Sequence, residues 1–198
     1  MTTDDEVEEE DRLRADWYGL LARLLGAEPD DAFLRSLAEL EGDDSEMGQA
    51  VSTLAKTSAR LNSEDLKHEY FALFIGAGES ELLPYASYYK TGFLNDRPLA
   101  RLRNDMLTLG LARNEGVSEP EDHIASLCEM MAALISGDFG DPLPLEEQNA
   151  FFEKHLNGWA QRFFEDLEAA PSAHFYMPVG TIGKIFFSIE AQAFEMAA

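Results

Sequence analysis

Cysteine, basic residues and long apolar runs are all scarce in this sequence. Cys128 is the single cysteine, so no disulfide can form within the chain, and a reducing compartment is expected. The uninterrupted apolar runs are only a few residues long, too short to cross a bilayer. The first residues, MTTDDEVEEED, lack the basic and apolar regions of a secretory signal. These absences predict a cytoplasmic protein without stable membrane insertion.

Positive charge is scarce as well. Lysine and arginine total 15 against 38 aspartates and glutamates, which gives a net charge of −23. Such a surface repels nucleic acid phosphates and anionic lipids, so neither is an expected partner. It favours a cationic partner such as an arginine-rich peptide. Solubility or adaptation to a salty medium explains the same charge, and composition alone leaves both interpretations open.

Sequence motifs of common enzymes and metal sites are missing too. No G-x-S-x-G, G-x-x-x-x-G-K-[ST] or G-x-G-x-x-G pattern is present. His68 and Glu69 lack the second histidine of a zincin helix, and His155 and His174 stand alone. We therefore predict no catalytic residue, no metal and no cofactor. One alternative stays open, a nucleotide-binding switch or small hydrolase that uses the glycines of segment 76–80.

The sequence is rich in helical periodicity. Apolar residues recur at spacings of three, four and seven, and no segment shows the sustained alternation of a strand. The first such face runs from Leu13 through Trp17 and Leu20 to Leu25. We expect an all-α, single-domain bundle of about seven to nine helices. The expected helices cover roughly 13–25, 30–40, 46–61, 63–75, 98–112, 118–136, 145–169 and 173–196.

Two segments fall outside this periodicity. Residues 1–10 are expected to form an acidic disordered tail, because like charges repel and little apolar surface can be buried. The single helical domain then covers 11–198. Residues 76–95 are irregular, with several glycines, Pro84 and large aromatic side chains. A long loop of this kind is a candidate functional segment, although its aromatics could equally pack into the core.

A capping pattern precedes one apolar face, in the stretch "SEPEDHI". Ser118 with Glu121 three residues later predicts a capping box, and Pro120 suits the first turn of a helix. Capping does not require Asp122 or His123. The two side chains point about 100° apart on a helix. A histidine beside carboxylates can titrate near neutrality.

A second motif, Tyr70-Phe71-Ala72-Leu73-Phe74, stands about 45 residues earlier. Alone it is typical of a helix packed in a core. The two motifs in this order, with the loop "LLPYASYY" between them, resemble the twin-arginine redox-enzyme maturation chaperones of the TorD/DmsD family. That family carries Y/F/W-x-x-L-F and E-P-x-D-H at a similar separation. The resemblance covers roughly residues 13–195, and the C-terminal third matches only in helical character.

The resemblance implies an all-α chaperone that is not an enzyme. Such a chaperone binds the twin-arginine leader of a molybdopterin oxidoreductase catalytic subunit and assists cofactor insertion before export. Its expected partners are that precursor and the cofactor-insertion machinery, with the choice between monomer and homodimer left open. A structural assembly subunit of a redox complex is a further alternative. The positions that match the family's leader-binding motifs are Tyr70, Leu73, Phe74, Pro84, Tyr85, Glu119, Pro120, Asp122 and His123.

The residues themselves are compatible with this role. Asp122, with Glu119 or Glu121, is expected to pair with a guanidinium, while the aromatic side chains take an apolar stretch. One departure concerns the loop. Some relatives place a tryptophan there, whereas this chain has Tyr85 and no tryptophan between Trp17 and Trp159. The choice of leader is therefore not predicted.

Overall fold

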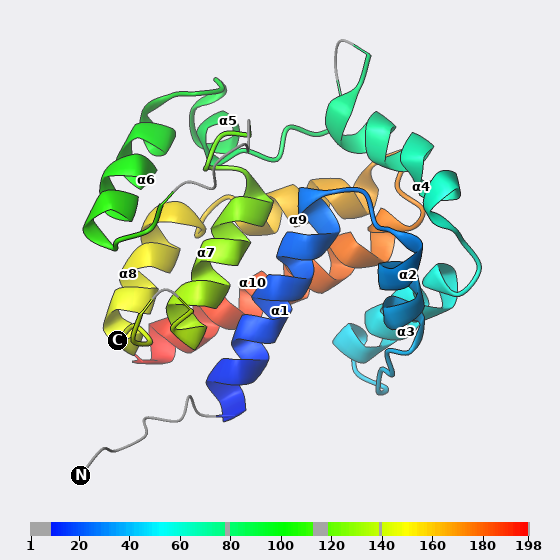
Figure 1. Ribbon diagram of the computed structural model, residues 1–198, viewed down its shortest axis with the longest axis horizontal. Coiled ribbons are helices and arrows are strands. Elements are labelled where there is room, and N and C mark those ends of the chain that lie inside the picture. The colour runs from blue at the N-terminus through cyan, green and yellow to red at the C-terminus, as the bar shows by residue number, and fades with distance from the viewer. Residues whose placement is uncertain (1–8, 78–79, 113–118, 139, 198) are drawn as a thin grey trace.

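The computed structural model of the protein describes residues 9–77, 80–112, 119–138 and 140–197. Within these ranges it holds ten α-helices, one π-helix and no strand (Figure 1). This confirms the all-α fold class. The helices are α1 (Glu9–Gly26), α2 (Asp31–Ala38), α3 (Glu46–Ser58), α4 (Ser63–Tyr70), the π-helix (Phe71–Ile75), α5 (Ala86–Thr91), α6 (Arg97–Thr108), α7 (Ile124–Ser136), α8 (Leu145–His155), α9 (Ala160–Ala169) and α10 (Tyr176–Ala197).

The helix number is slightly higher than expected for two local reasons. The segment expected as a loop contains α5, which ends at Gly92 with a left-handed φ of 82°. The single helix expected over 145–169 is broken into α8 and α9, where Gly158 has a φ of 77°. At the N-terminus, Glu9 and Glu10 already belong to α1, while the rest of the expected acidic tail lies outside the described residues.

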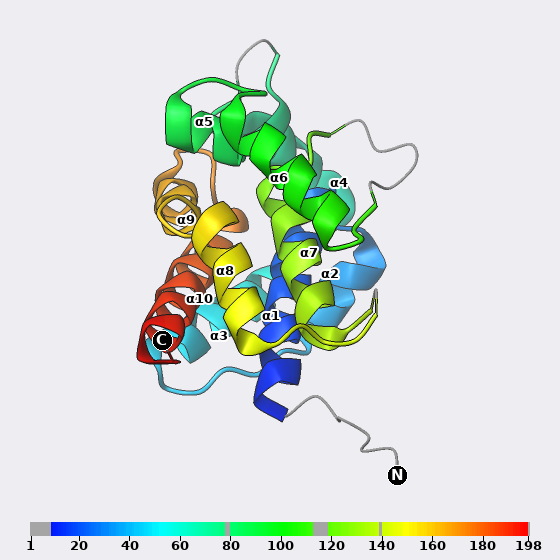
Figure 2. The same cartoon turned by 90° about the vertical axis from the view of Figure 1, so that its left-hand side faces the viewer.

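Four helices build the centre of the molecule. α1 packs most extensively against α7, and α10 against α9 (Figures 1 and 2). On one side of this centre lie α2, α3 and α4, and on the other α5, α6 and α8 (Figure 1). The core is rich in aromatic side chains, and the largest fully buried ones are Trp159, Tyr18, Tyr176, Phe152, Phe163, Phe164, Phe175 and Phe187.

Two glycines allow α10 to approach α9 closely. A Cβ atom at Gly180 would lie 2.4 Å from the backbone nitrogen of Glu168, and one at Gly183 would lie 2.1 Å from the Phe164 ring. Real Cβ atoms do not come so near to other atoms, so any side chain at either position would force the helices apart. The aromatic core therefore depends on these glycines.

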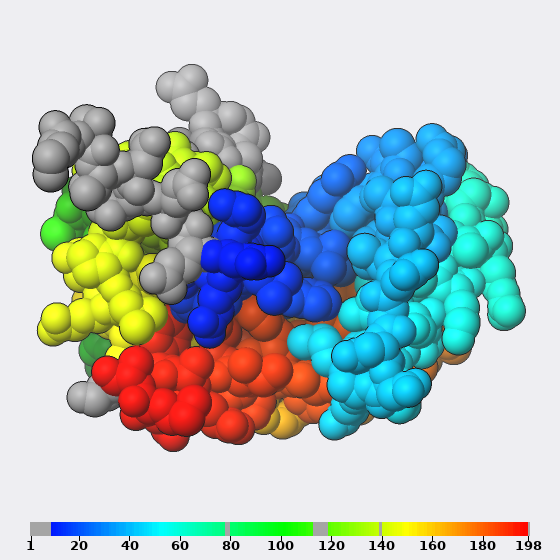
Figure 3. Space-filling view, turned by 90° about the horizontal axis from the view of Figure 1, so that it is seen from below, coloured from blue at the N-terminus to red at the C-terminus, as the bar shows by residue number. Residues whose placement is uncertain are grey.

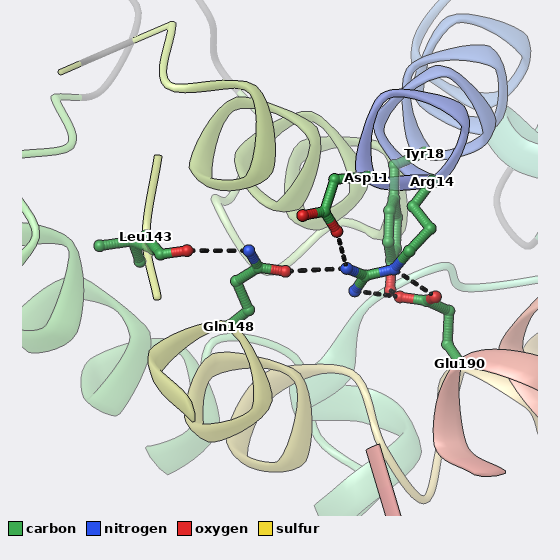
Figure 4. Close-up of polar contacts among 6 residues, drawn as sticks. All are labelled: Asp11, Arg14, Tyr18, Leu143, Gln148 and Glu190. Atoms are coloured by element: carbon green, nitrogen blue, oxygen red, sulfur yellow. Dashed lines mark hydrogen bonds and ion pairs between the residues drawn. The ribbon is translucent and has the colours of Figure 1, made fainter. Parts of the chain in front are cut away.

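A buried polar cluster joins α1 to α8 and α10 (Figure 4). The Arg14 guanidinium donates two hydrogen bonds to Glu190, at 2.8 and 2.9 Å, and one to Asp11 at 2.7 Å. It also donates to Gln148 of α8 at 3.0 Å, and the Tyr18 hydroxyl donates to Glu190 at 3.0 Å. Glu190 is 2% exposed, so its charge depends on these partners for stabilisation.

The apolar face predicted for the first helix is divided in the structure. Leu21, Leu24 and Leu25 enter the core, whereas Leu13 is 57% exposed. Leu13, Trp17 and Leu20 line an open groove between α1 and the α2–α3 segment, which is visible as a hollow in Figure 3. Among the described helices, none combines the length and apolarity needed to cross a membrane.

Candidate functional site

The Tyr70–Phe74 motif lies where α4 passes into the π-helix. α4 begins with a capping box between Asn62 and Asp65. The π-helix ends at Gly76, whose N–H donates to the Phe71 carbonyl oxygen at 2.7 Å and whose φ is 67°. Single π-turns within helices are frequent at functional sites. Here the turn leaves Phe71 and Ile75 exposed, at 43% and 55%.

The motif also contributes to the core. Leu73 is fully buried, and Tyr70 is 9% exposed. The Phe74 ring contacts the rings of Tyr70 and Tyr176, each with centroids 5.1 Å apart in edge-on geometry. Burial raises the pKa of Tyr70 to about 12. The motif thus exposes Phe71 and part of Phe74 to solvent, and the aromatic cluster holds the Phe74 ring in place.

The loop after the π-helix folds back onto it. The N–H groups of Glu81 and Leu82 donate to the carbonyl oxygens of Ala72 and Leu73, at 3.0 and 2.9 Å. These carbonyls are at the end of a helix and have no partner further along it, so the loop satisfies them. The loop is therefore fixed by backbone hydrogen bonds before it reaches Pro84.

A short antiparallel bridge then joins this loop to the second motif. The Ala86 N–H donates to the Asp122 carbonyl oxygen at 2.9 Å, and the Ile124 N–H donates to the Pro84 carbonyl oxygen at 2.8 Å. The rings of Tyr85 and His123 meet edge-on with centroids 5.2 Å apart. The structure thus brings the two sequence motifs together, through the loop that separates them.

Asp122 has a structural partner in this arrangement. Its Oδ2 atom accepts the Ser87 N–H at 2.8 Å, in the first turn of α5. The residue is 1% exposed, and its Oδ1 atom has no hydrogen-bond partner in the described part of the chain. The expectation that Asp122 pairs directly with an arginine does not fit this burial. Its carboxylate instead caps α5 from a distant segment.

The capping box expected at Ser118 and Glu121 is a wrong prediction. α7 begins only at Ile124, and its N-cap is His123, whose Nδ1 atom accepts the Ala125 N–H at 3.1 Å. Ser118 lies outside the described residues. Glu121 instead accepts two hydrogen bonds from the Arg103 guanidinium of α6, at 3.0 and 2.8 Å. Tertiary pairing has therefore moved the start of the helix.

His123 is neutral in this setting. Burial lowers its pKa to about 4, an effect that the nearby carboxylates of Glu119 and Asp122 only partly oppose. Titration near neutrality, as the sequence suggested, is thus a wrong expectation. Because Nδ1 accepts a hydrogen bond, the proton of the neutral ring lies on Nε2.

Glu119 is the exposed carboxylate of the second motif. It accepts a short hydrogen bond from the Tyr85 hydroxyl. The pKa of Tyr85 is raised, first by burial and then by this carboxylate. Tyr85 and Glu119 therefore form a polar ridge at the surface.

This ridge separates two hollows. We call the first the tyrosine cleft; it has a volume of about 1280 Å³ and includes side chains of the π-helix, the 80–94 segment and the end of α9. We call the second the α1–α7 hollow, because small residues of these two helices form its floor. Both are lined by Phe74, Ile75, Tyr85 and Glu119.

The residues predicted from the two motifs divide by exposure. Phe74, Tyr85, Glu119 and Pro120 reach the surface, at least in part. Tyr70, Leu73, Pro84, Asp122 and His123 are buried, although Tyr70 and His123 still line the α1–α7 hollow. Their assignment to leader binding stays a prediction.

Helix α9 contributes residues to the tyrosine cleft that no sequence motif indicated. Arg162 and Asp166 line the tyrosine cleft with the small residues that follow them, and Asp166 accepts a hydrogen bond from the Tyr89 hydroxyl at 2.7 Å. These residues stand more than 70 positions after Tyr89 and belong to no motif, so nothing local in the sequence identifies them.

The other expectations concern metals and nucleotides. Over the ranges that the structure describes, no group of three histidine, cysteine, aspartate or glutamate side chains is arranged to hold a metal ion. The glycine segment of the nucleotide alternative includes residues 78 and 79, which lie outside those ranges. Cys128 is buried, and burial raises the pKa of its thiol, which fits a core residue.

Comparison with known proteins defines the class of molecule. TorD chaperones of Vibrio parahaemolyticus and Vibrio atlanticus are each 27% identical to this chain. The first alignment covers 81% of this chain and 79% of the relative, and the second covers 96% and 97%. A redox enzyme maturation protein from Archaeoglobus fulgidus has a similar fold, with a TM-score of 0.62 at 20% identity over 89% of this chain and 94% of the other. Both of these relatives are named chaperones, and the solved structure shows that this chain shares the fold of the maturation protein.

The family follows from a wider match. The model of the nitrate reductase delta subunit family matches residues 40–165, well over half of the sequence. The chain belongs to this family, and its resemblance to the TorD chaperones is confirmed.

Proposed function

We propose that this chaperone binds the twin-arginine leader of a molybdopterin oxidoreductase catalytic subunit in the cytoplasm and holds the precursor until its cofactor is inserted. The observation that carries the proposal is the pair of hollows on either side of the Tyr85–Glu119 ridge. A twin-arginine leader has two arginines followed by an apolar stretch. Its binder needs carboxylates beside an apolar surface, and both occur here.

The dimensions of the tyrosine cleft suit a peptide. Its volume of about 1280 Å³ exceeds the range of about 300–1,000 Å³ that is usual for small ligands. Ile75, Tyr88 and Leu94 contribute side chains that are 55%, 39% and 44% exposed. Grouped exposed apolar side chains are typical of interaction sites. An apolar stretch could lie there as a helix in a groove.

The acidic surface supports the proposal in a different way. A net charge of −23 attracts a cationic leader and speeds the encounter, an effect that weakens with added salt. Individual exposed ion pairs contribute only about 0–1 kcal/mol. Most of the affinity is therefore assigned to apolar anchors in the cleft.

The buried members of the two motifs have supporting roles in this proposal. Asp122 caps α5, which carries Tyr88 and Tyr89 into the cleft. His123 holds the start of α7 and the ring of Tyr85. Loss of either side chain would weaken binding by moving the walls of the site and not by removing a contact with the leader.

The test uses a peptide array that displays every twin-arginine leader encoded by the source organism, followed by calorimetry with the best binder. Ile75→Ser should weaken that binding by about fivefold, because about 1 kcal/mol of apolar burial is lost. Ile189→Ser on α10 is the matched control, since Ile189 is 53% exposed and lies away from both hollows. The proposal would be wrong if the chaperone bound none of the leaders. It would also be wrong if Ile75→Ser and Ile189→Ser weakened binding by the same factor.

The family description itself favours a second candidate, a structural subunit that stays with a redox complex. Affinity purification from cells distinguishes the two. The leader-binding chaperone should recover unprocessed precursor, whereas an assembly subunit should recover the mature, cofactor-loaded enzyme.

A further inference from the structure

The α1–α7 hollow differs from the tyrosine cleft in how its carboxylates are hydrogen-bonded. In the cleft, Asp166 accepts a hydrogen bond from the Tyr89 hydroxyl. Glu81 accepts hydrogen bonds from the backbone N–H and the hydroxyl of Ser172. These carboxylates are already engaged within the protein. Part of their capacity to accept hydrogen bonds is therefore already used within the protein.

The hollow contains carboxylates of another kind. Glu129 and Asp138 line it from α7 and the residues just after that helix, and both are exposed. Across the described ranges, neither side chain takes part in a hydrogen bond or ion pair with another residue. Arg23 is the one cation lining this hollow in that part of the chain, and its guanidinium stacks on the Phe33 ring at 3.8 Å.

An independent feature of the same hollow also points to a ligand. His123 lines it and is only 9% exposed. Its Nδ1 atom accepts the Ala125 N–H, so Nε2 carries the proton, and this donor has no acceptor among the residues described. Nε2 is not among the fully buried polar atoms that lack a partner, so this N–H is open to the hollow. A carbonyl oxygen of a bound peptide would satisfy it.

The floor of the hollow allows a backbone to come close. Gly19, Ala22 and Gly26 of α1 line it together with Ala125 and Ala132 of α7, and a Cβ atom at Gly26 would lie 3.5 Å from the Ala125 side chain. Such small side chains leave room for an extended segment above the contact between the two helices. An arginine pair on that segment would lie beside Glu129 and Asp138.

We infer that the α1–α7 hollow is the subsite for the arginine pair of the leader, with Glu129 and Asp138 as the residues that recognise it, and that the tyrosine cleft takes the apolar stretch. This inference rests on the proposed function. One peptide can occupy both hollows because they share the wall formed by Phe74, Ile75, Tyr85 and Glu119. The leader therefore crosses the Tyr85–Glu119 ridge with its arginines on the α7 side.

The first experiment measures calorimetric binding of the best leader from the array and of the same peptide with Gln-Gln in place of Arg-Arg. Glu129→Gln combined with Asp138→Asn should weaken binding of the arginine peptide by about fivefold or more and leave the glutamine peptide unchanged. The matched control, Asp44→Asn with Glu195→Gln, removes the same charge at exposed positions outside the hollow and should change neither affinity by more than about twofold.

The second experiment tests the direction of the peptide by disulfide cross-linking. Ser126→Cys in the hollow should capture a leader with a cysteine next to the arginines, and Leu94→Cys in the cleft should capture one with a cysteine at its apolar end. Native Cys128 is buried and remains in both proteins. Reversed cross-links, or equal losses for the arginine and glutamine peptides, would overturn the inference while leaving leader binding intact. An unmutated chaperone that binds no leader would refute the proposed function instead.

Discussion

Replacing Asp122 separates a positioning role from direct recognition of arginine. The carboxylate is 1% exposed and accepts the Ser87 N–H at 2.8 Å, so it holds the first turn of α5. Asp122→Ala removes that acceptor and leaves a buried N–H without a partner. Asp122→Asn keeps an oxygen at the same place.

The size of the effect follows from two overlapping contributions. Loss of a cap lowers the free energy of unfolding by about 0.5–2 kcal/mol, and an unsatisfied buried donor by about 1–3 kcal/mol. For Asp122→Ala we expect a decrease of about 2–3 kcal/mol, and for Asp122→Asn a smaller one. A native domain is stable by about 5–15 kcal/mol, so both variants should remain folded.

Urea denaturation measures these changes, and calorimetry with the Arg-Arg and Gln-Gln leader peptides measures their effect on binding. If Asp122 acts by positioning α5, Asp122→Ala weakens both peptides by the same factor, in step with the loss of stability. If Asp122→Asn kept full stability but lost the preference for the arginine peptide, the carboxylate would contact arginine directly. That result would contradict a purely positioning role for Asp122.

Three further predictions concern stability. Glu190→Gln should lower the free energy of unfolding by about 3–5 kcal/mol in urea titrations, because it leaves the Arg14 guanidinium without its buried partner. The double variant Arg14→Met with Glu190→Met should lose less stability than the sum of its two single variants, and additive losses would contradict the pairing. His123 has a pKa of about 4 in the folded protein and about 6.5 in the unfolded chain, so only the unfolded state binds a proton between these values, and up to about 3 kcal/mol of stability is lost as the pH falls from 6.5 to 4. His123→Asn, which keeps a capping oxygen, should lack this part of the pH dependence. If the stability of both proteins fell equally with pH, the prediction would be wrong. Gly183→Ala should destabilise the protein by about 1–3 kcal/mol in thermal melting, because the new Cβ atom would clash with the Phe164 ring. Gly19→Ala is the matched control and should be neutral or stabilising, because a Cβ atom there meets no atom within 4 Å.

Periodic apolar spacing predicted most of the helices, because each of them buries one face against the core. It failed where the chain is organised by distant partners. α7 begins six residues after Ser118, at Ile124, since the backbone on either side of His123 pairs with the segment around Tyr85. α5 is short and has no side-chain cap of its own, and Asp122 supplies one from another segment. Such long-range contacts cannot be identified from the local sequence.

The candidate site shows the same division. The two motifs correctly pointed to one region, because Tyr85 and His123 meet in a backbone bridge. They did not reveal that Asp122 is buried while Glu119 is exposed, since neighbouring carboxylates look alike in a sequence. Nor did they indicate Asp166, whose place in the tyrosine cleft depends on how α9 packs. Burial is decided by tertiary structure, and exposure decides which motif residue can contact a partner.

Hydrogen–deuterium exchange of the chaperone, with and without its best leader peptide, tests whether the leader binds between the two motifs. Binding should slow exchange in the π-helix, in residues 80–94 and in the first turns of α7, with little change in α3 or at the C-terminal end of α10. A leader that binds tightly but slows exchange only outside those segments would contradict the placement of the site between the two motifs.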